Sequence, residues 1–225
     1  MGFCIFYHIA VMSGWKDSHD IIESYLIDSK IVESCDQIVY CINGNFQEVV
    51  NYAKIFSEKQ LFVNMWNDFD RYEFPTINFL KQYLGQIEVK ALYIHTKCAS
   101  HYNILDGGCC AYWLDTMCYY NISNFAVNAA LLDTYDAIGS GYCVEPWSHF
   151  SGNFWWSKSS HIRKLSPLIF GYENFPHDAK FGQRHDAERW VCSQPGLFYN
   201  LGVGHPSSRF RRMYDTWEFE STRNV

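Results

Sequence analysis

The run Phe3-Cys4-Ile5-Phe6-Tyr7-His8-Ile9-Ala10-Val11 is apolar and aromatic, and Ser13-Gly14 ends it. Such a run is typical of a buried strand followed by a turn. Residues 17–34 then carry apolar side chains at helical spacing, with Asp17 and Ser18 as candidate N-caps. This strand and helix are the first unit of a repeating pattern.

The same alternation continues to residue 95. Further strands are expected at 37–42, 61–66 and 89–95. Helices are expected at 46–57 and from Pro75 to Leu84, since proline is favoured at the first helical position. Four strands separated by helices indicate a parallel sheet covered on both faces. The sequence therefore predicts an α/β fold with a mostly parallel central sheet flanked by helices.

The second half of the chain is less regular. A long, largely buried helix is expected at 109–132, a strand at 136–143, an aromatic loop and strand at 146–156, and short helices at 157–165 and 183–192. No segment rich in proline, glycine or serine divides the chain. The 225 residues are therefore expected to form one domain, with 206–225 as a peripheral tail.

Composition argues against several classes of protein. Hydrophobic residues make up 48% of the chain, too many for a disordered protein, and the net charge of −6 argues against a nucleic-acid partner. The nine cysteines are an odd number without a Cys-x-x-Cys pair, which is typical of free thiols in a reducing compartment. Without a leader sequence or an apolar run of about 20 residues, we expect a cytoplasmic protein with no membrane span.

Polar side chains gather where the expected parallel strands end. Ligands of doubly wound sheets bind beyond the carboxyl ends of the strands. His8, His95, Thr96 and Lys97 are therefore candidate nucleotide and diphosphate ligands around one crevice. Lys97 is suited to neutralising a diphosphate leaving group. No dinucleotide fingerprint or P-loop motif follows these strands, which disfavours a dehydrogenase and a P-loop NTPase.

Three residues compete as metal ligands. Asp68 and Asp70 have the Asp-x-Asp spacing with which two carboxylates hold Mg²⁺ or Mn²⁺ against a diphosphate. These aspartates follow the third expected strand, whereas His95 ends the fourth. The sequence leaves the choice among them open.

The segment from Trp147 to Trp156 interleaves five aromatic rings with short polar side chains. Flat apolar rings beside hydrogen-bonding groups suit a sugar. Alternation along a strand sends its two last tryptophans to opposite faces, so one of them is expected in the core. The competing interpretation is an aromatic core strand. The candidate sugar and acceptor ligands are His149, Ser151, Gly152, Asn153, Trp155 and Trp156.

The segment Arg184-His185-Asp186-Ala187-Glu188-Arg189-Trp190 supplies two carboxylates in a helical context. Residues two apart on a helix point in different directions, so only one of Asp186 and Glu188 can face an acceptor. That residue would be a general base that removes a proton from the acceptor hydroxyl, with Glu188 as the first candidate and Asp186 as the second. A charged helix face anchored by Trp190 explains the segment equally well.

Several of these segments resemble, in order, the motifs of a family of small glycosyltransferases from bacterial polysaccharide loci and chloroviruses, in which they contribute to the capsid glycan. The similarity runs over about residues 3–200, and Cys98 and Leu114 depart from it where the family has Gly and Arg. The segments are Tyr93-Ile94-His95-Thr96-Lys97, Trp113 with Met117, Tyr119 and Tyr120, His149-Phe150-Ser151-Gly152-Asn153-Phe154-Trp155-Trp156, and Ala187-Glu188-Arg189-Trp190.

This resemblance implies a GT-A-type fold, a UDP-sugar donor, a glycan or glycoprotein acceptor, and dependence on Mn²⁺ or Mg²⁺. The domain would then comprise a nucleotide-binding half, 1–100, and a sugar and acceptor half, 101–205. Two functions of other classes compete with a transferase. One is a non-catalytic carbohydrate-binding protein that uses the Trp147–Trp156 loop, and the other is a thiol enzyme that uses Cys109 or Cys110.

Overall fold

The computed structural model describes residues 2–55, 58–65, 69–97, 99, 109–171, 174–175 and 184–202, with the side chains of residues 109, 110 and 184 left aside. Several sequence predictions lie outside this part: the metal role of Asp68, the departure at Cys98, the thiols of Cys109 and Cys110, and the 206–225 tail.

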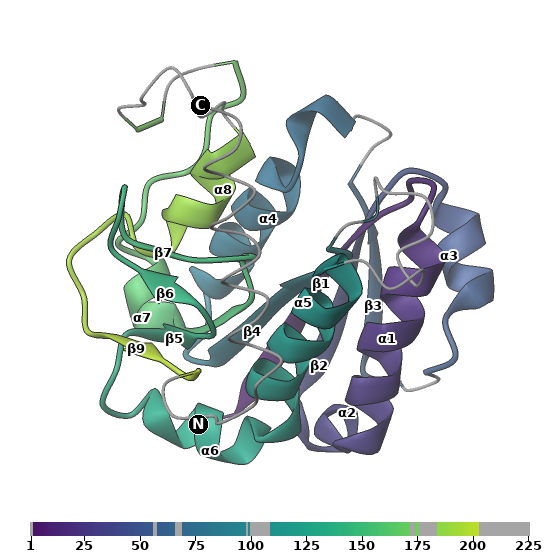
Figure 1. Ribbon diagram of the computed structural model, residues 1–225, viewed down its shortest axis with the longest axis horizontal. Coiled ribbons are helices and arrows are strands. Elements are labelled where there is room, and N and C mark those ends of the chain that lie inside the picture. The colour runs from purple at the N-terminus through teal and green to yellow at the C-terminus, as the bar shows by residue number, and fades with distance from the viewer. Residues whose placement is uncertain are drawn as a thin grey trace.

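A seven-stranded sheet forms the centre of the molecule (Figure 1). Six of its described strands run parallel to one another, and only β8 runs against its neighbours β4 and β5. The predicted fold class, an α/β domain with a mostly parallel sheet flanked by helices, is therefore confirmed. In spatial order the strands are β3 (Gln60–Asn64), β2 (Gln37–Asn43), β1 (Phe3–Ala10), β4 (Lys90–His95), β8 (Trp155–Lys158), β5 (Ala137–Gly139) and β9 (Phe198–Asn200).

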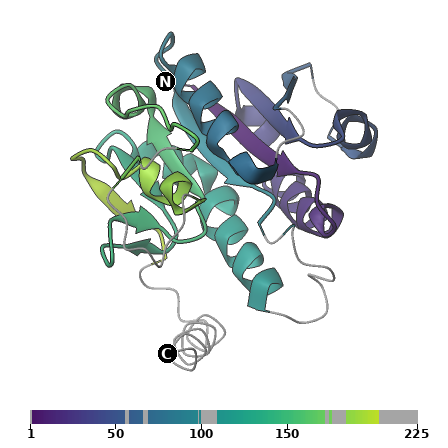
Figure 2. The ribbon, with the colours of Figure 1, turned by 90° about the horizontal axis from the view of Figure 1, so that it is seen from above.

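Helices cover both faces of the sheet (Figures 1 and 2). Helices α1 (Trp15–Asp28) and α5 (Cys109–Cys118) pack on one face. Helices α4 (Phe74–Leu84), α7 (Ser159–Ile162) and α8 (Arg184–Trp190) pack on the other. Because side chains alternate along a strand, β1 contributes Ile5 and Tyr7 to the first core and Phe6 to the second. Because helices cover both faces, the side chains on both sides of a strand are buried, which explains why the strands are continuous apolar runs in the sequence.

The first half of the chain follows the sequence prediction closely. Helix α4 includes Pro75 in its first turn, as expected. The helix predicted at 17–34 begins earlier, at Trp15, and is interrupted at Lys30, whose φ of 60° is left-handed. A short helix α2 (Ile31–Ser34) follows, and the remaining helices of this half are α3 (Phe46–Tyr52) and the 3₁₀ turn η1 (Phe69–Arg71).

The long buried helix predicted at 109–132 is wrong in two respects. A π-helical turn, η2 (Tyr119–Ser123), separates α5 from α6 (Phe125–Leu131). The helices are also buried on one face only, since Tyr112 and Val127 are largely exposed. An apolar composition without proline predicted the helix but not its solvent face.

Two predicted strands are each divided by a turn. Residues 136–143 form β5 and the two-residue β6 (Tyr142–Cys143), with Gly141 at φ 69° between them. Residues 146–156 form β7 (His149–Phe150) and part of β8. Strands β6 and β7 pair with each other in a separate small sheet. The positive φ values at the turns end the strands, because no extended backbone passes through that region.

None of the helices within the described ranges has the length and apolar character needed to cross a bilayer.

Candidate functional site

The carboxyl ends of β1 and β4 lie side by side, with His8 opposite His95 in the register. Both imidazoles are buried. His8 Nδ1 lies 2.8 Å from Thr76 Oγ1 of α4. His95 Nε2 lies 2.8 Å from the Gly152 carbonyl oxygen, which can only accept, so Nε2 carries the proton of this hydrogen bond. The structure therefore brings His8 and His95 together at this edge of the sheet.

Both histidines are held in the neutral state. Burial lowers the pKa of His8 to about 4, against the opposing effect of Glu73 and with a further lowering by His95. Burial and then the charge of Lys97 lower the pKa of His95 to about 3. With Nε2 protonated, Nδ1 of the neutral His95 presents a lone pair.

Glu73 completes this cluster, and the sequence analysis missed it. The residue occupies the N-cap position of α4, but its side chain makes no capping hydrogen bond. Its Oε2 accepts hydrogen bonds from the Tyr93 hydroxyl and from Asn153 Nδ2, each at 2.6 Å. Its Oε1 lies 3.7 Å from His95 Nδ1. A glutamate before a helix is an ordinary sequence feature, so nothing local marked it.

The turn between β7 and β8 holds these groups in place. Gly152 and Asn153 adopt φ values of 86° and 59°. A side chain at position 152 would overlap Met117 Sδ and approach Trp113 Cζ2 to 3.2 Å, so the turn packs closely against α5. Asn153 is fully buried, and its Oδ1 accepts a hydrogen bond of 2.8 Å from Trp155 Nε1. This bond orients the amide toward Glu73.

Lys97, just beyond the carboxyl end of β4, forms an ion pair with Glu188 of α8, a pairing that the sequence analysis did not predict. Lys97 Nζ lies 3.8 Å from Glu188 Oε1 and 4.5 Å from the centre of the Trp113 ring. Both side chains are mostly buried. By contrast, Thr96 faces inward, where its Oγ1 accepts a hydrogen bond of 3.0 Å from the Ala10 amide. Thr96 therefore fixes the backbone of the strand ends.

Asp186 points away from Glu188, which agrees with the expectation that only one of them faces the crevice. The Asp186 side chain is fully buried, and its Oδ2 accepts a hydrogen bond of 3.0 Å from Asn174 Nδ2. Glu188, with a side chain that is 20% exposed, is therefore the more accessible of the two carboxylates.

His149 and Ser151 bond to each other in the small sheet. His149 Nε2 lies 3.2 Å from Ser151 Oγ, and His149 Nδ1 lies 2.8 Å from the Trp147 carbonyl oxygen. Ser151 Oγ is also 3.7 Å from Cys143 Sγ. The next two residues of the chain, Gly152 and Asn153, connect this pair to His95 and Glu73.

Trp155 and Trp156 are both core residues, which corrects the expectation that they contact a sugar. They point to opposite faces, as predicted, but both rings are fully buried. Trp155 stacks on Tyr93 at 5.0 Å between ring centres. Trp156 donates a hydrogen bond of 2.8 Å to the Asn121 carbonyl oxygen. Only one of the two rings was expected to be buried, because double coverage by helices was inferred for the strands of the first half and not for this one.

The described residues do not form a ready-made metal centre. Asp70 lies in η1 with an exposed side chain. Within the described ranges no three His, Cys, Asp or Glu side chains are grouped so as to hold a metal ion. A cation held by His95 or another of these described residues would therefore need further ligands from elsewhere.

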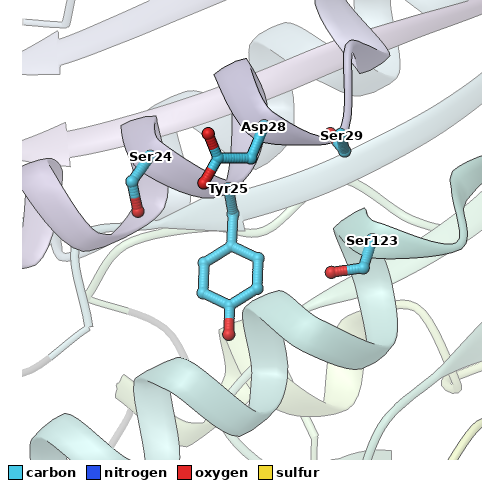
Figure 3. Close-up of a pocket in the computed structure, with 5 residues that line it drawn as sticks. All are labelled: Ser24, Tyr25, Asp28, Ser29 and Ser123. Atoms are coloured by element: carbon cyan, nitrogen blue, oxygen red, sulfur yellow. The ribbon is translucent and has the colours of Figure 1, made fainter.

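A separate pocket of about 240 Å³ lies between α1 and η2, lined by Ser24, Tyr25, Asp28, Ser29 and Ser123 (Figure 3). It is at the far end of α1. From this end of α1 the chain continues to Asp36, whose amide donates a hydrogen bond to the Phe3 carbonyl oxygen. Phe3 is at the start of β1, the end opposite to its carboxyl end. The pocket is therefore remote from the carboxyl edge of the sheet.

No family model and no curated protein matches this sequence. Solved structures of similar fold include Rv0371c from Mycobacterium tuberculosis H37Rv in complex with manganese, at 9% identity and a TM-score of 0.37, covering 73% of this chain and 77% of that one. Another is 4-diphosphocytidyl-2C-methyl-D-erythritol synthase from Anaerococcus prevotii DSM 20548, at 10% identity and a TM-score of 0.40, covering 75% and 78%. Likeness at this level supports no statement about activity, which has to rest on the residues themselves.

Proposed function

We propose that the protein is a glycosyltransferase that moves a sugar from a UDP-sugar to a glycan acceptor with the help of a divalent cation. The observation that carries this proposal is the pairing of Lys97 with Glu188 at the mouth of a mostly parallel sheet, 3.8 Å apart. A fixed cation and an accessible carboxylate are the two groups that glycosyl transfer needs, for the leaving diphosphate and for the attacking hydroxyl.

On the donor side, the nucleotide would lie over the carboxyl ends of β1 to β3, near His8 and the turns that follow these strands. Lys97 would then face the diphosphate. The negative charge that develops on the leaving oxygen is the main electrostatic cost of the reaction, and a preorganised ammonium group stabilises it. Because Lys97 is mostly buried and rests on the Trp113 ring, its position is already restricted before the donor binds.

On the acceptor side, Glu188 would be the general base if the reaction inverts the sugar. A diphosphate that engages Lys97 weakens the Lys97–Glu188 ion pair, which leaves the carboxylate available. Glu188 then takes the proton of the acceptor hydroxyl while that oxygen bonds to the anomeric carbon. The bond from this carbon to the diphosphate oxygen breaks, and its electron pair leaves with the diphosphate.

The remaining contacts of the sugar and the metal follow from the same geometry. The sugar would be bordered by His149, Ser151 and the 151–153 turn. Asn153 would act indirectly, through its hydrogen bond to Glu73. Trp155 and Trp156 would support the turn from the core. A bound Mn²⁺ or Mg²⁺ would supply further positive charge to the diphosphate. His95 is the sequence-predicted ligand that lies inside the crevice.

A screen of nucleotide sugars for metal-dependent hydrolysis and transfer tests the proposal, with Lys97→Met as the variant. We expect kcat/KM to fall by about 100-fold or more, because the loss of one preorganised charge at a leaving group costs about 3 kcal/mol.

Lys16→Met is the matched control for Lys97→Met. Lys16 also pairs with a glutamate, Glu48, and lies near a tryptophan ring, Trp15, but it is on the surface of α1. The kcat/KM of the Lys16→Met variant should stay within about twofold of the wild-type value. Equal activity of Lys97→Met and Lys16→Met, or a screen in which no nucleotide sugar is consumed, would contradict the proposal.

The competing function is a non-catalytic carbohydrate-binding protein. The burial of Phe150, Phe154, Trp155 and Trp156 removes four of the five rings on which that interpretation depended. Calorimetry with UDP and Mn²⁺ separates the two functions, since a protein that binds only glycans should not respond to the nucleotide.

A further inference from the structure

The transferase proposal leaves open what Glu73 and His95 do together. His95 Nε2 donates its proton to the Gly152 carbonyl, which leaves a lone pair on Nδ1. Glu73 Oε2 is occupied by Tyr93 and Asn153, which leaves Oε1 turned toward that lone pair at 3.7 Å. Two electron-pair donors thus face one another, beyond hydrogen-bond distance.

Both atoms can be satisfied by one group placed between them, either a water molecule that donates a hydrogen bond to each or a cation that binds both. A cation bound to both atoms at about 2.1 Å fits the gap, because two such bonds span at most about 4.2 Å.

We propose that Glu73 Oε1 and His95 Nδ1 are the protein ligands of a divalent transition-metal cation in this crevice. The remaining positions would be filled by water or by the oxygens of a diphosphate, as is usual for cations held by one or two protein groups. A mixed nitrogen and oxygen pair favours a first-row transition metal over Ca²⁺ or Mg²⁺.

The supporting residues give the pair the rigidity of a built site. Two hydrogen bonds of 2.6 Å hold the carboxylate, and one of 2.8 Å holds the imidazole. The donors behind them, Tyr93 and Asn153, are fully buried. Partners that orient metal ligands in this way contribute strongly to metal affinity. The exposed Asp70, the rival carboxylate, has no such support among the described contacts.

This inference deepens the proposed function, because it names the cation site beside the diphosphate, but its test needs neither donor sugar nor acceptor. Binding of Mn²⁺ alone, and of Mn²⁺ with UDP, is measured by calorimetry on the full chain. We expect Glu73→Gln to weaken Mn²⁺ binding about tenfold or more. The glutamine amide can accept from Tyr93 and Asn153 and donate to His95 Nδ1, so the variant should keep its fold.

Asp70→Asn makes the same change in the rival carboxylate and should leave Mn²⁺ affinity within about twofold. In the wild-type protein, electron spin echo modulation of bound Mn²⁺ should show coupling to an imidazole nitrogen. Undiminished Mn²⁺ binding by Glu73→Gln, loss in Asp70→Asn alone, absence of nitrogen coupling, or no binding by the wild type would each overturn the inference. The first three results would leave the transferase proposal intact, since that proposal depends on the sugar-transfer assay. A wild-type protein that binds neither Mn²⁺ nor Mn²⁺ with UDP would count against both.

Discussion

Gly152 is the single residue on which the crevice most depends. Its carbonyl orients His95, and its φ of 86° lets the chain turn so that Asn153 reaches Glu73. The space where a side chain would stand is already filled by Met117 and Trp113 of α5. One glycine therefore joins the helix on one face of the sheet to the polar groups on the other.

We predict that Gly152→Ala destabilises the protein more than Gly171→Ala. Both glycines have positive φ, so both alanine variants suffer backbone strain of about 1–2 kcal/mol. At position 152 the new methyl group would also overlap Met117, and this overpacking should cost about 1–3 kcal/mol more. At position 171 nothing described lies within 4 Å of a Cβ, so no overpacking is expected there. Urea unfolding gives the two free energies. If both variants lose the same amount, close packing at position 152 does not contribute.

The helical segment from α5 to α6 is the least regular element of the fold. The π-helical turn η2 shifts the register of its backbone hydrogen bonds. Side chains bind the carbonyls at this turn: Asn128 Nδ2 donates to the Tyr120 and Asn121 carbonyls at 2.8 and 3.2 Å, and Trp156 Nε1 also donates to Asn121. The turn is thereby fixed to the central sheet.

We predict that Asn128→Ala lowers the free energy of unfolding by about 1–3 kcal/mol, because the part-buried Tyr120 carbonyl loses this donor and the buried Asn121 carbonyl keeps only Trp156 Nε1. The adjacent Val127→Ala is the control. Val127 is 61% exposed on the same helix, so its loss should change stability by less than about 0.5 kcal/mol. Urea unfolding of both variants checks this, and equal stability of the two variants would show that the carbonyls do not need Asn128.

The stability of the whole molecule should depend on pH because of its buried histidines. His8 and His95 have pKa values lowered to about 4 and about 3, while an unfolded histidine titrates near 6.5. Below pH 6.5 the unfolded chain therefore binds more protons than the folded chain. By linkage, stability is complete above pH 6.5 and falls with acidification down to the folded pKa values.

Between pH 7 and pH 5 we expect the free energy of unfolding to fall by about 1–2 kcal/mol for each of these two histidines. Below that range, carboxylates with lowered pKa values, such as Asp20 and Asp136, add to the loss. Urea unfolding across this range measures the slope. Between pH 7 and pH 8 these histidines should not change the free energy of unfolding. A free energy of unfolding that stays constant from pH 7 to pH 5 would be inconsistent with neutral, buried imidazoles.

Much of the fold was predictable because it follows from short sequence patterns, such as apolar runs and helix-starting prolines. The run from Phe3 predicted β1, and Pro75 predicted the start of α4 to within one residue. The rule that ligands lie at the carboxyl ends of parallel strands then placed His8, His95 and Lys97 around one crevice. The predicted helix at 109–132 was less accurate, since composition does not reveal a π-helical turn.

The sequence by itself thus determined the class of fold and the edge of the sheet where polar groups meet, because strand and helix periodicity and strand direction follow from neighbouring residues. Only the tertiary structure decided which groups meet there. Glu73 and Asn153 are 80 positions apart, and Lys97 and Glu188 are farther still. Their contacts, and the burial of both Trp155 and Trp156, depend on how helices from distant parts of the chain pack over the sheet, which no local pattern encodes.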